Sequence, residues 1–314
     1  MANIGEMSSV NNKTLKKQVI QGTVFLLALG AALVLFIIFF GVKFREAGNK
    51  KNLLVHWEQG AWMEVYETSK DALASKPMDA FYLTINGFAA YQAAMAQINN
   101  SEALEYIDQC IWTLRKALLG KNTDKDGRIR YVLGKAYYAK GPDYADLSVR
   151  YLEEAKSAVF SAGDLNEYLG LAYAAIKDYR KSIEALTASL ASAGKDADSD
   201  MLLMRIAQSY MGLEDWEMAK TYLIRCIDAS RDTGLALKSR LFLGKVLRNS
   251  GDLDGAIAAF DLVLEESGEN AEAAFEIGEI YASRGDTIRA RAAWRRAHRS
   301  DPNFAPVMAR LNTL

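Results

Sequence analysis

Residues 271–304 read AEAAFEIGEIYASRGDTIRARAAWRRAHRSDPNF, and this stretch decides the fold more clearly than any other part of the chain. Small and apolar residues recur in it at helical spacing, at Ile277, Gly278, Tyr281, Ala290, Trp294 and Ala297. Gly285 separates two such runs, and Pro302 follows the second. The stretch therefore predicts two helices that are joined by a tight turn and ended by a proline.

The same pattern returns along the preceding chain. Its small residue recurs at Gly134, Gly170, Ala207, Gly244 and Gly278, with spacings of 36, 37, 37 and 34 residues. A small residue in the first helix of each unit lets the second helix approach closely. One such unit cannot bury its apolar face alone, so the repetition predicts a stack of helix pairs.

The signature residues of 271–304 resemble the consensus of the tetratricopeptide (TPR) repeat, a helical hairpin of 34 residues. The resemblance covers roughly residues 46–314 and is strongest after residue 127, because two earlier units, marked by Gly60 and Gly87, diverge from it. It implies an all-α fold, a TPR-like helical-hairpin solenoid of about 6–7 repeats, and a role in binding other proteins. One transmembrane helix is expected to precede the solenoid.

That transmembrane helix is predicted by the residues near the amino terminus. Residues 18–42 contain no charge, and 24–42 consist only of Leu, Ile, Val, Phe, Ala and Gly. Nineteen helical residues span roughly 30 Å, the thickness of the hydrocarbon core of a bilayer. No small-residue cleavage site follows, so we interpret the segment as a retained signal-anchor.

The charges on either side of this segment nearly cancel. Lysines precede it at 13, 16 and 17, and basic residues follow it at 43, 45, 50 and 51. A short lysine-bearing tail favours a bacterial inner-membrane protein with its carboxyl-terminal solenoid in the periplasm. A cytoplasmic solenoid is the alternative, and the unpaired cysteines Cys110 and Cys226 favour it modestly.

The predicted segments follow from these observations. They are a short polar tail (1–18), a transmembrane helix (19–42), a juxtamembrane linker (43–51), divergent TPR-like repeats (52–126), regular TPR-like repeats (127–302) and a carboxyl-terminal capping helix (303–314).

The composition gives no support for catalysis, a cofactor or nucleic-acid binding. The net charge of −1 provides no general basic field, and the two cysteines lack metal-binding spacing and are expected to pack in the core. The two histidines, His56 and His298, lie at opposite ends of the predicted solenoid. Residues 122–127 resemble the start of a calcium loop, but the twelfth position holds Leu133 instead of a glutamate. We therefore expect no enzyme activity, no cofactor and no metal.

The resemblance also implies a binding surface, because the first helices of TPR-like repeats line a concave groove through positions 2, 5, 9 and 12 of each repeat. Carried onto this chain, these positions give the candidate partner-binding residues Phe81, Phe88, Tyr91, Arg128, Tyr131, Lys135, Tyr138, Met201, Met204, Met211, Lys238, Lys245 and Arg248. The groove would have an aromatic end, a methionine patch and a basic end, suited to a peptide or helix with apolar anchors and acidic residues. In the alternative interpretation, many of these side chains pack between repeats.

The function predicted from the sequence is a membrane-anchored adaptor. Its solenoid would recruit or scaffold partner proteins at the membrane, in an envelope, secretion or motor-associated complex. The alternative is a structural scaffold that self-associates into a homo-oligomer within a membrane-bound assembly.

Overall fold

The computed structural model describes residues 47–192 and 199–311. The predicted transmembrane helix, 19–42, lies outside the described residues. Within them, no helix combines the length and apolar character needed to cross a membrane.

Pairs of helices follow one another along the described chain. Helical residues 47–58 precede α2 (Trp62–Ser75). The pairs that follow are α3 (Ala80–Ala96) with α4 (Asn100–Ala117), α5 (Gly127–Lys140) with α6 (Ala145–Ser157), α7 (Leu165–Ala175) with α8 (Tyr179–Ser192), α9 (Ser199–Gly212) with α10 (Trp216–Ala229), α11 (Thr233–Ser250) with α12 (Leu253–Ser267), and α13 (Ala271–Ser283) with α14 (Thr287–Ser300). A 3-10 turn, η1 (Pro142–Tyr144), precedes α6, and α15 (Ala305–Leu311) follows the last pair.

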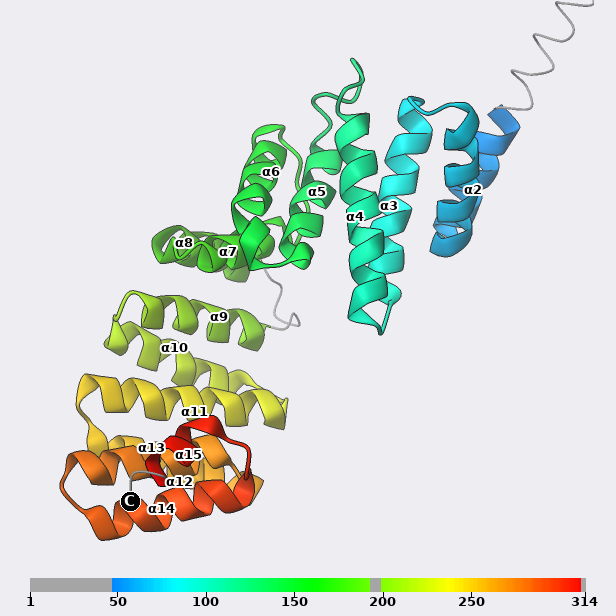
Figure 1. The fold of residues 1–314 in the computed structure, drawn as a ribbon. Coiled ribbons are helices and arrows are strands. Elements are labelled where there is room, and N and C mark those ends of the chain that lie inside the picture. The colour runs from blue at the N-terminus through cyan, green and yellow to red at the C-terminus, as the bar shows by residue number, and fades with distance from the viewer. Residues whose placement is uncertain (1–46, 193–198, 312–314) are drawn as a thin grey trace, which may run out of the picture.

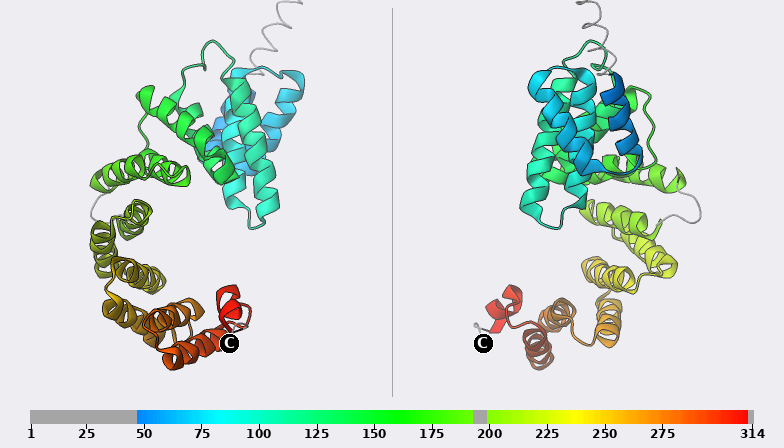
Figure 2. Two further views of the ribbon diagram at one scale, coloured as in Figure 1. Left: turned by 60° about the vertical axis from the view of Figure 1, so that its left-hand side comes forward. Right: turned by 90° about the vertical axis from the view of Figure 1, so that its right-hand side faces the viewer.

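The pairs stack into a curved array, and the prediction of an all-α helical-hairpin solenoid is confirmed (Figure 1). In the left view of Figure 2 the array follows an arc from α3 and α4 to α15. Each first helix contacts the first helix of the next pair, from α3 through α5, α7, α9 and α11 to α13. We call the surface formed by these first helices the inner face.

Side-chain caps explain where most of these helices begin. An aspartate or asparagine precedes the first turn and accepts a hydrogen bond from a backbone N–H that the helix itself leaves unpaired. These residues are Asp79, Asn99, Asp126, Asp215, Asp232, Asp252, Asn270 and Asp286. Each cap stabilises its helix by about 1 kcal/mol.

The small residue of each repeat has the role expected from the sequence. A Cβ atom added to Gly134 would lie 2.5 Å from Cγ of Leu152, and one added to Gly170 would lie 2.4 Å from Cγ of Leu186. Both leucines are fully buried on the second helix of the same pair. The absence of a side chain at these positions therefore sets the short distance between the two helices.

The apolar core runs between the helices along the array. Cys110 and Cys226 are buried and unpaired in it, as expected, and burial raises the pKa of both thiols. At the carboxyl-terminal end, Val307 of α15 is fully buried in a cluster that includes Trp294 and Ala297 of α14. The last pair is thus covered by α15.

Candidate partner-binding surfaces

An ion pair on the inner face joins α5 to the start of α7. Lys135 Nζ lies 2.8 Å from Oδ2 of Asp164, the residue that precedes α7. Tyr131 donates a hydrogen bond to the same carboxylate, and the ring of Tyr168 lies 4.3 Å from Lys135 Nζ. Two of the predicted groove residues, Tyr131 and Lys135, are therefore brought together, but they hold two repeats in place.

The pKa values in this cluster follow from burial and from these contacts. Burial alone would raise the pKa of Asp164, but hydrogen bonds from Lys135 and Tyr131 outweigh it, and the pKa lies below its usual value. Burial and the hydrogen bond to Asp164 raise the pKa of Tyr131 to about 12. The cluster thus contains an ammonium, a carboxylate and a neutral phenol at neutral pH.

Similar ion pairs occupy the other end of the inner face, where the sequence predicts a basic surface. Lys245 Nζ on α11 lies 2.5 Å from Oε1 of Glu272 on α13, and Arg248 pairs with Glu276 on the same helix. Glu276 is buried, which raises the pKa of its carboxyl against the opposing effect of Arg248. The prediction of a basic end is wrong, because carboxylates from the next repeat neutralise these two cations.

The middle of the inner face differs from the α5–α7 and α11–α13 junctions. Within the described residues, no ion pair joins α7 to α9 or α9 to α11. Five half-buried side chains on α5, α7 and α9 line this part of the inner face, and we call them the central inner surface. They are Tyr138 of α5, Glu167 and Leu171 of α7, and Arg205 and Gln208 of α9.

The central inner surface combines an aromatic ring with groups of both charges. Tyr138 stands edge-on to Tyr168, with ring centroids 5.7 Å apart. Arg205 Nη1 lies 3.4 Å from Gln208 Oε1. Burial raises the pKa of Glu167 and nearby Asp164 raises it further, while Arg205 lowers it. The surface can therefore donate hydrogen bonds from a guanidinium and an amide beside an aromatic and an aliphatic contact.

A cavity of about 620 Å³ borders this surface, where α7, α9 and α11 begin. Its lining includes Glu167, Met201, Asp200 and Asp232. Asp200 accepts a hydrogen bond from Ser230, and Asp232 caps α11. The edge of the inner face where α7, α9 and α11 begin is therefore acidic, whereas the neighbouring Arg205 is basic.

The structure excludes two of the predicted groove residues. Met204 is buried in a cluster with Cys226 and Leu235, so its prediction as a groove residue is wrong, and the adjacent Arg205 takes the inner position. Tyr91 is also buried, packed in the core of the first repeats. Neither side chain can contact a partner without rearrangement of the core.

The other predicted residues are spread over the inner face. Phe81 and Phe88 are half-buried against the core of the first repeats, and Arg128 is exposed but paired with Asp126 of its own helix start, at 2.8 Å. Met201 and Lys238 are exposed, and Met211 is half-buried. Of the predicted set, Tyr138 belongs to the central inner surface, with Met201 at its edge.

The set of candidate residues predicted from the sequence left out the acidic residues of the inner face. Positions 2 and 5 of the α7 repeat are Asp164 and Glu167, and positions 2 and 9 of the α13 repeat are Glu272 and Glu279. The projection that gave the basic residues would have given these acids too. Arg205 follows Met204, which holds position 5 of the α9 repeat, so the repeat positions did not predict Arg205.

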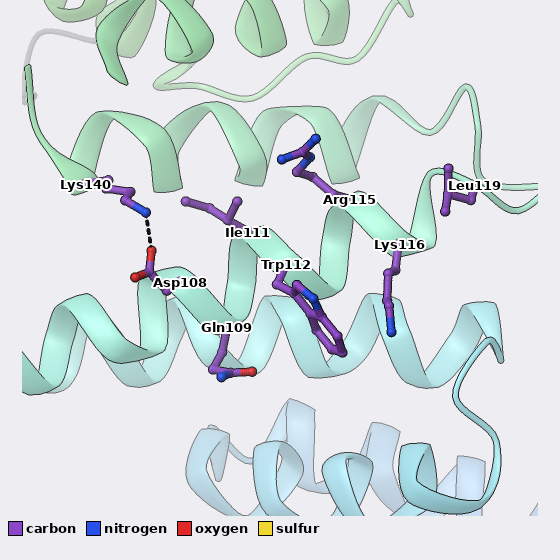
Figure 3. Close-up of a pocket in the computed structure, with 8 residues that line it drawn as sticks. All are labelled: Asp108, Gln109, Ile111, Trp112, Arg115, Lys116, Leu119 and Lys140. Carbon is purple, nitrogen blue, oxygen red and sulfur yellow. Dashed lines mark hydrogen bonds and ion pairs between the residues drawn. The ribbon is translucent and has the colours of Figure 1, made fainter. Parts of the chain in front are cut away.

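A second cavity, of about 630 Å³, lies on the outer side of α4 (Figure 3). Trp112 is 56% exposed there, and Lys116 Nζ lies 3.7 Å from its ring centroid. Lys140, at the end of α5, closes one side through an ion pair of 2.5 Å with Asp108. Leu119 also lines this pocket, which we call the Trp112 pocket. It is outside the predicted groove and was not anticipated.

The described residues contain no group of three or more His, Cys, Asp or Glu side chains placed to hold a metal ion.

Comparison with known proteins identifies the fold family. The profile of the tetratricopeptide repeat-like domain matches residues 150–311, which is just over half of the chain. The chain belongs to the tetratricopeptide repeat-like family. This family is in general a non-catalytic protein-interaction module, so the match supports a protein–protein interaction scaffold in general terms.

Three solved structures are similar to this chain at low sequence identity. The carboxyl-terminal part of a TPR repeat-containing protein from Cytophaga hutchinsonii has a TM-score of 0.56 at 14% identity, over 83% of this chain and 98% of that chain. YrrB, described as a TPR protein with an unusual peptide-binding site, has a TM-score of 0.48 at 18% identity, over 63% and 97% of the two chains. The Cut9–Hcn1 hetero-tetramer has a TM-score of 0.49 at 17% identity, and the match spans 47% of that chain. No curated protein matches this chain.

Proposed function

We propose that this chain is a membrane-anchored adaptor whose TPR-like solenoid recruits a partner protein through the central inner surface. One observation carries the proposal. Ion pairs between consecutive first helices lie at the α5–α7 and α11–α13 junctions, whereas none joins α7 to α9 or α9 to α11 within the described residues. Polar groups that are not committed to holding the repeats together are available to a ligand.

The chemistry of this surface defines the partner segment. Arg205 and Gln208 suit a carboxylate or a backbone carbonyl, and Arg is a frequent anchor at protein interfaces. Tyr138 and Leu171 offer an apolar contact beside them. The segment is therefore a peptide or helix that presents an acidic side chain next to an apolar one.

The anchor of the adaptor is the apolar run 19–42, which has the length of a single span. We propose a bacterial inner-membrane location with the solenoid in the periplasm, where it serves an envelope, secretion or motor-associated complex. Protease treatment of intact spheroplasts, with and without permeabilisation, tests this topology. Digestion of the solenoid in intact spheroplasts is expected, and protection until permeabilisation would place the solenoid in the cytoplasm.

Site-specific photocrosslinking tests the partner surface. A photoreactive residue replaces Gln208 in the full chain in native membranes, and a matched control replaces Glu217, which is exposed on α10. We expect an adduct with another protein at 208, several-fold weaker at 217, and loss of that adduct when Arg205→Glu is added. Equal adducts at both positions would show that the central inner surface is not the binding site.

The alternative function is a self-associating scaffold, for which the Trp112 pocket provides a surface away from the inner face. Adducts formed only between copies of this chain would favour that alternative. Placing the photoreactive residue at Trp112 in the same membranes identifies the surface involved.

A further inference from the structure

Four segments of the amino-terminal half meet at one end of its helices. Lys50 Nζ lies 3.0 Å from Oδ2 of Asp79, which connects the start of the described chain to the start of α3. A Cβ atom on Gly120 would lie 3.9 Å from the Cβ of Ala80, so the α4–α5 loop lies beside the same helix start. Lys125 of that loop and Val159, after α6, line a common cavity.

We call this end of the molecule the loop end and define it by residues 47–51, 76–79, 118–126 and 156–160. In Figure 1 the α4–α5 loop and the point where the described chain begins lie at the same end of the helices.

Three segments of the loop end, 76–79, 118–126 and 156–160, each expose a large apolar side chain to solvent. Met78 is 55% exposed, Leu119 is 75% exposed and Val159 is 92% exposed. Val159 also has a φ of 58°, a conformation that is strained for a β-branched residue. Transfer of such side chains out of water is favourable in proportion to the apolar area that is buried. Their repetition on three loops of one end indicates a common apolar contact.

The charges at the loop end are mainly positive. Lys51, Lys121, Lys125 and Lys156 are exposed and form no ion pair with the rest of the described chain. The carboxylates of Asp79 and Asp126 are paired with Lys50 and Arg128. Asp124 is the exposed carboxylate of the α4–α5 loop. Lysines around exposed apolar side chains complement the anionic headgroups of a phospholipid surface.

The length of the linker limits how far the loop end can lie from a membrane. The predicted span ends at residue 42, and four residues (43–46), or five Cα-to-Cα steps, connect it to residue 47, where the described chain begins. Five such steps of a fully extended chain reach at most roughly 18 Å. Since residues 47–51 belong to the loop end, the span would hold this end, and no other part of the solenoid, close to the lipid headgroups.

We propose that the loop end is a membrane-contact surface that inserts Met78, Leu119 and Val159 into the headgroup region of an anionic bilayer. The proposal rests on the membrane anchor of the proposed function and adds to it a fixed orientation. The loop end of the first helix pairs would contact the bilayer. This contact would fix the direction in which the inner face points, whereas a flexible linker alone would let the solenoid rotate.

Nitroxide labels on the full chain in vesicles test this contact directly. Single Leu119→Cys, Val159→Cys and Ile288→Cys variants are labelled and reconstituted into vesicles of phosphatidylglycerol and phosphatidylethanolamine. The native cysteines are buried, and the unsubstituted chain measures their background. Collision rates with oxygen, which concentrates in lipid, and with a water-soluble nickel chelate are then compared.

We expect a several-fold higher ratio of oxygen to nickel collisions at 119 and 159 than at 288, an exposed position on α14. Lys121→Glu combined with Lys125→Glu should lower that ratio at 119. Equal ratios at all three positions, in a chain that stays in the vesicles after alkaline washing, would overturn the contact and leave the anchor intact. Shielding of 119 and 159 from both reagents would indicate a protein contact and also overturn the proposal. Release of the chain by alkaline washing would contradict the anchor itself.

Discussion

Asp164 is the residue through which the α5 and α7 repeats are joined on the inner face. It accepts hydrogen bonds from Lys135 and Tyr131 of α5 while it stands at the start of α7. A carboxylate at the amino-terminal end of a helix is also favoured by the helix dipole. One side chain therefore serves both the start of a helix and the packing of two repeats.

Asp164→Asn should lower the stability of the chain by about 1 kcal/mol at pH 7, because a half-exposed ion pair with shared hydrogen bonds contributes on that order. The pKa of Asp164 in the folded chain lies below its usual value of 3.8. The stability it provides is therefore present above about pH 4 and is lost as the pH falls through the folded pKa.

Thermal unfolding of both proteins at pH 7 and near pH 2.5 measures this effect. The difference in midpoint between them should be clear at pH 7 and smaller at the acidic pH. Asp228→Asn, at an exposed position on α10, is the control and should change neither midpoint. A difference for Asp164→Asn that does not depend on pH would show that the lost hydrogen-bond geometry, and not the charge, is responsible.

For individual residues, the sequence predicts the lining of the groove only in part. Tyr138 and Met201 lie where the repeat positions place them, because α5 and α9 have the helix phase that the projection assumes at these positions. Met204 fails because Cys226 of α10 and Leu235 of α11 pack against it and bury it, whereas the adjacent Arg205 stays half-exposed. Pairing of Lys245 with Glu272 depends on the distance between α11 and α13, which no single repeat encodes.

The helix pair is the element for which sequence and structure agree best. A glycine in the first helix faces a large side chain of the second in pairs such as Gly87 with Leu114 and Gly278 with Trp294. The spacing of these small residues predicted the pairs because the close approach is a local property of each hairpin. The array itself follows because each pair exposes an apolar face that the next one covers.

Gly170→Ala should destabilise the solenoid despite the higher helix propensity of alanine, which is worth about 1 kcal/mol. The added Cβ would lie 2.4 Å from Leu186 Cγ and 3.2 Å from the backbone nitrogen of Leu186, so the second helix must move. Overpacking of this kind costs about 1–3 kcal/mol, and the net change should lower the melting temperature.

Gly48→Ala provides the matched control, since Gly48 also lies in a helix and a Cβ there meets nothing within 4 Å. Its melting temperature should be unchanged or slightly higher. Circular dichroism of the two variants measures both effects. Equal melting temperatures for the Gly170→Ala and Gly48→Ala variants would show that the α7–α8 pair can relax without loss of packing.

For the whole molecule, stability depends on neighbouring pairs, because each repeat packs mainly on the ones before and after it. Within residues 47–192 and 199–311, the last pair has such a neighbour only on one side. The short helix α15 covers its other side, with Val307 fully buried and Arg310 paired with Glu279 at 2.6 Å.

Val307→Ser should therefore loosen the carboxyl-terminal end without affecting the other end of the array. The loss of a buried valine lowers stability by roughly 1–3 kcal/mol. We expect this loss to be local to α13 and α14, which pack next to α15. Hydrogen exchange measured by mass spectrometry should show faster exchange in α13–α15 and no change in α3–α4. Met308→Ser, at a partly exposed position of the same helix, should leave exchange unchanged. Faster exchange along the entire chain would mean that the array unfolds as a single unit.

The uneven distribution of ion pairs along the inner face has a mechanical consequence. Bending of the array changes the distance between consecutive first helices, and an ion pair that joins two of them resists this change. Such pairs link α5 to α7 and α11 to α13, but none in the described residues links α9 to either neighbour. The junctions on both sides of α9 therefore lack this resistance, and a ligand inserted there can change the curvature of the array without breaking an ion pair between first helices.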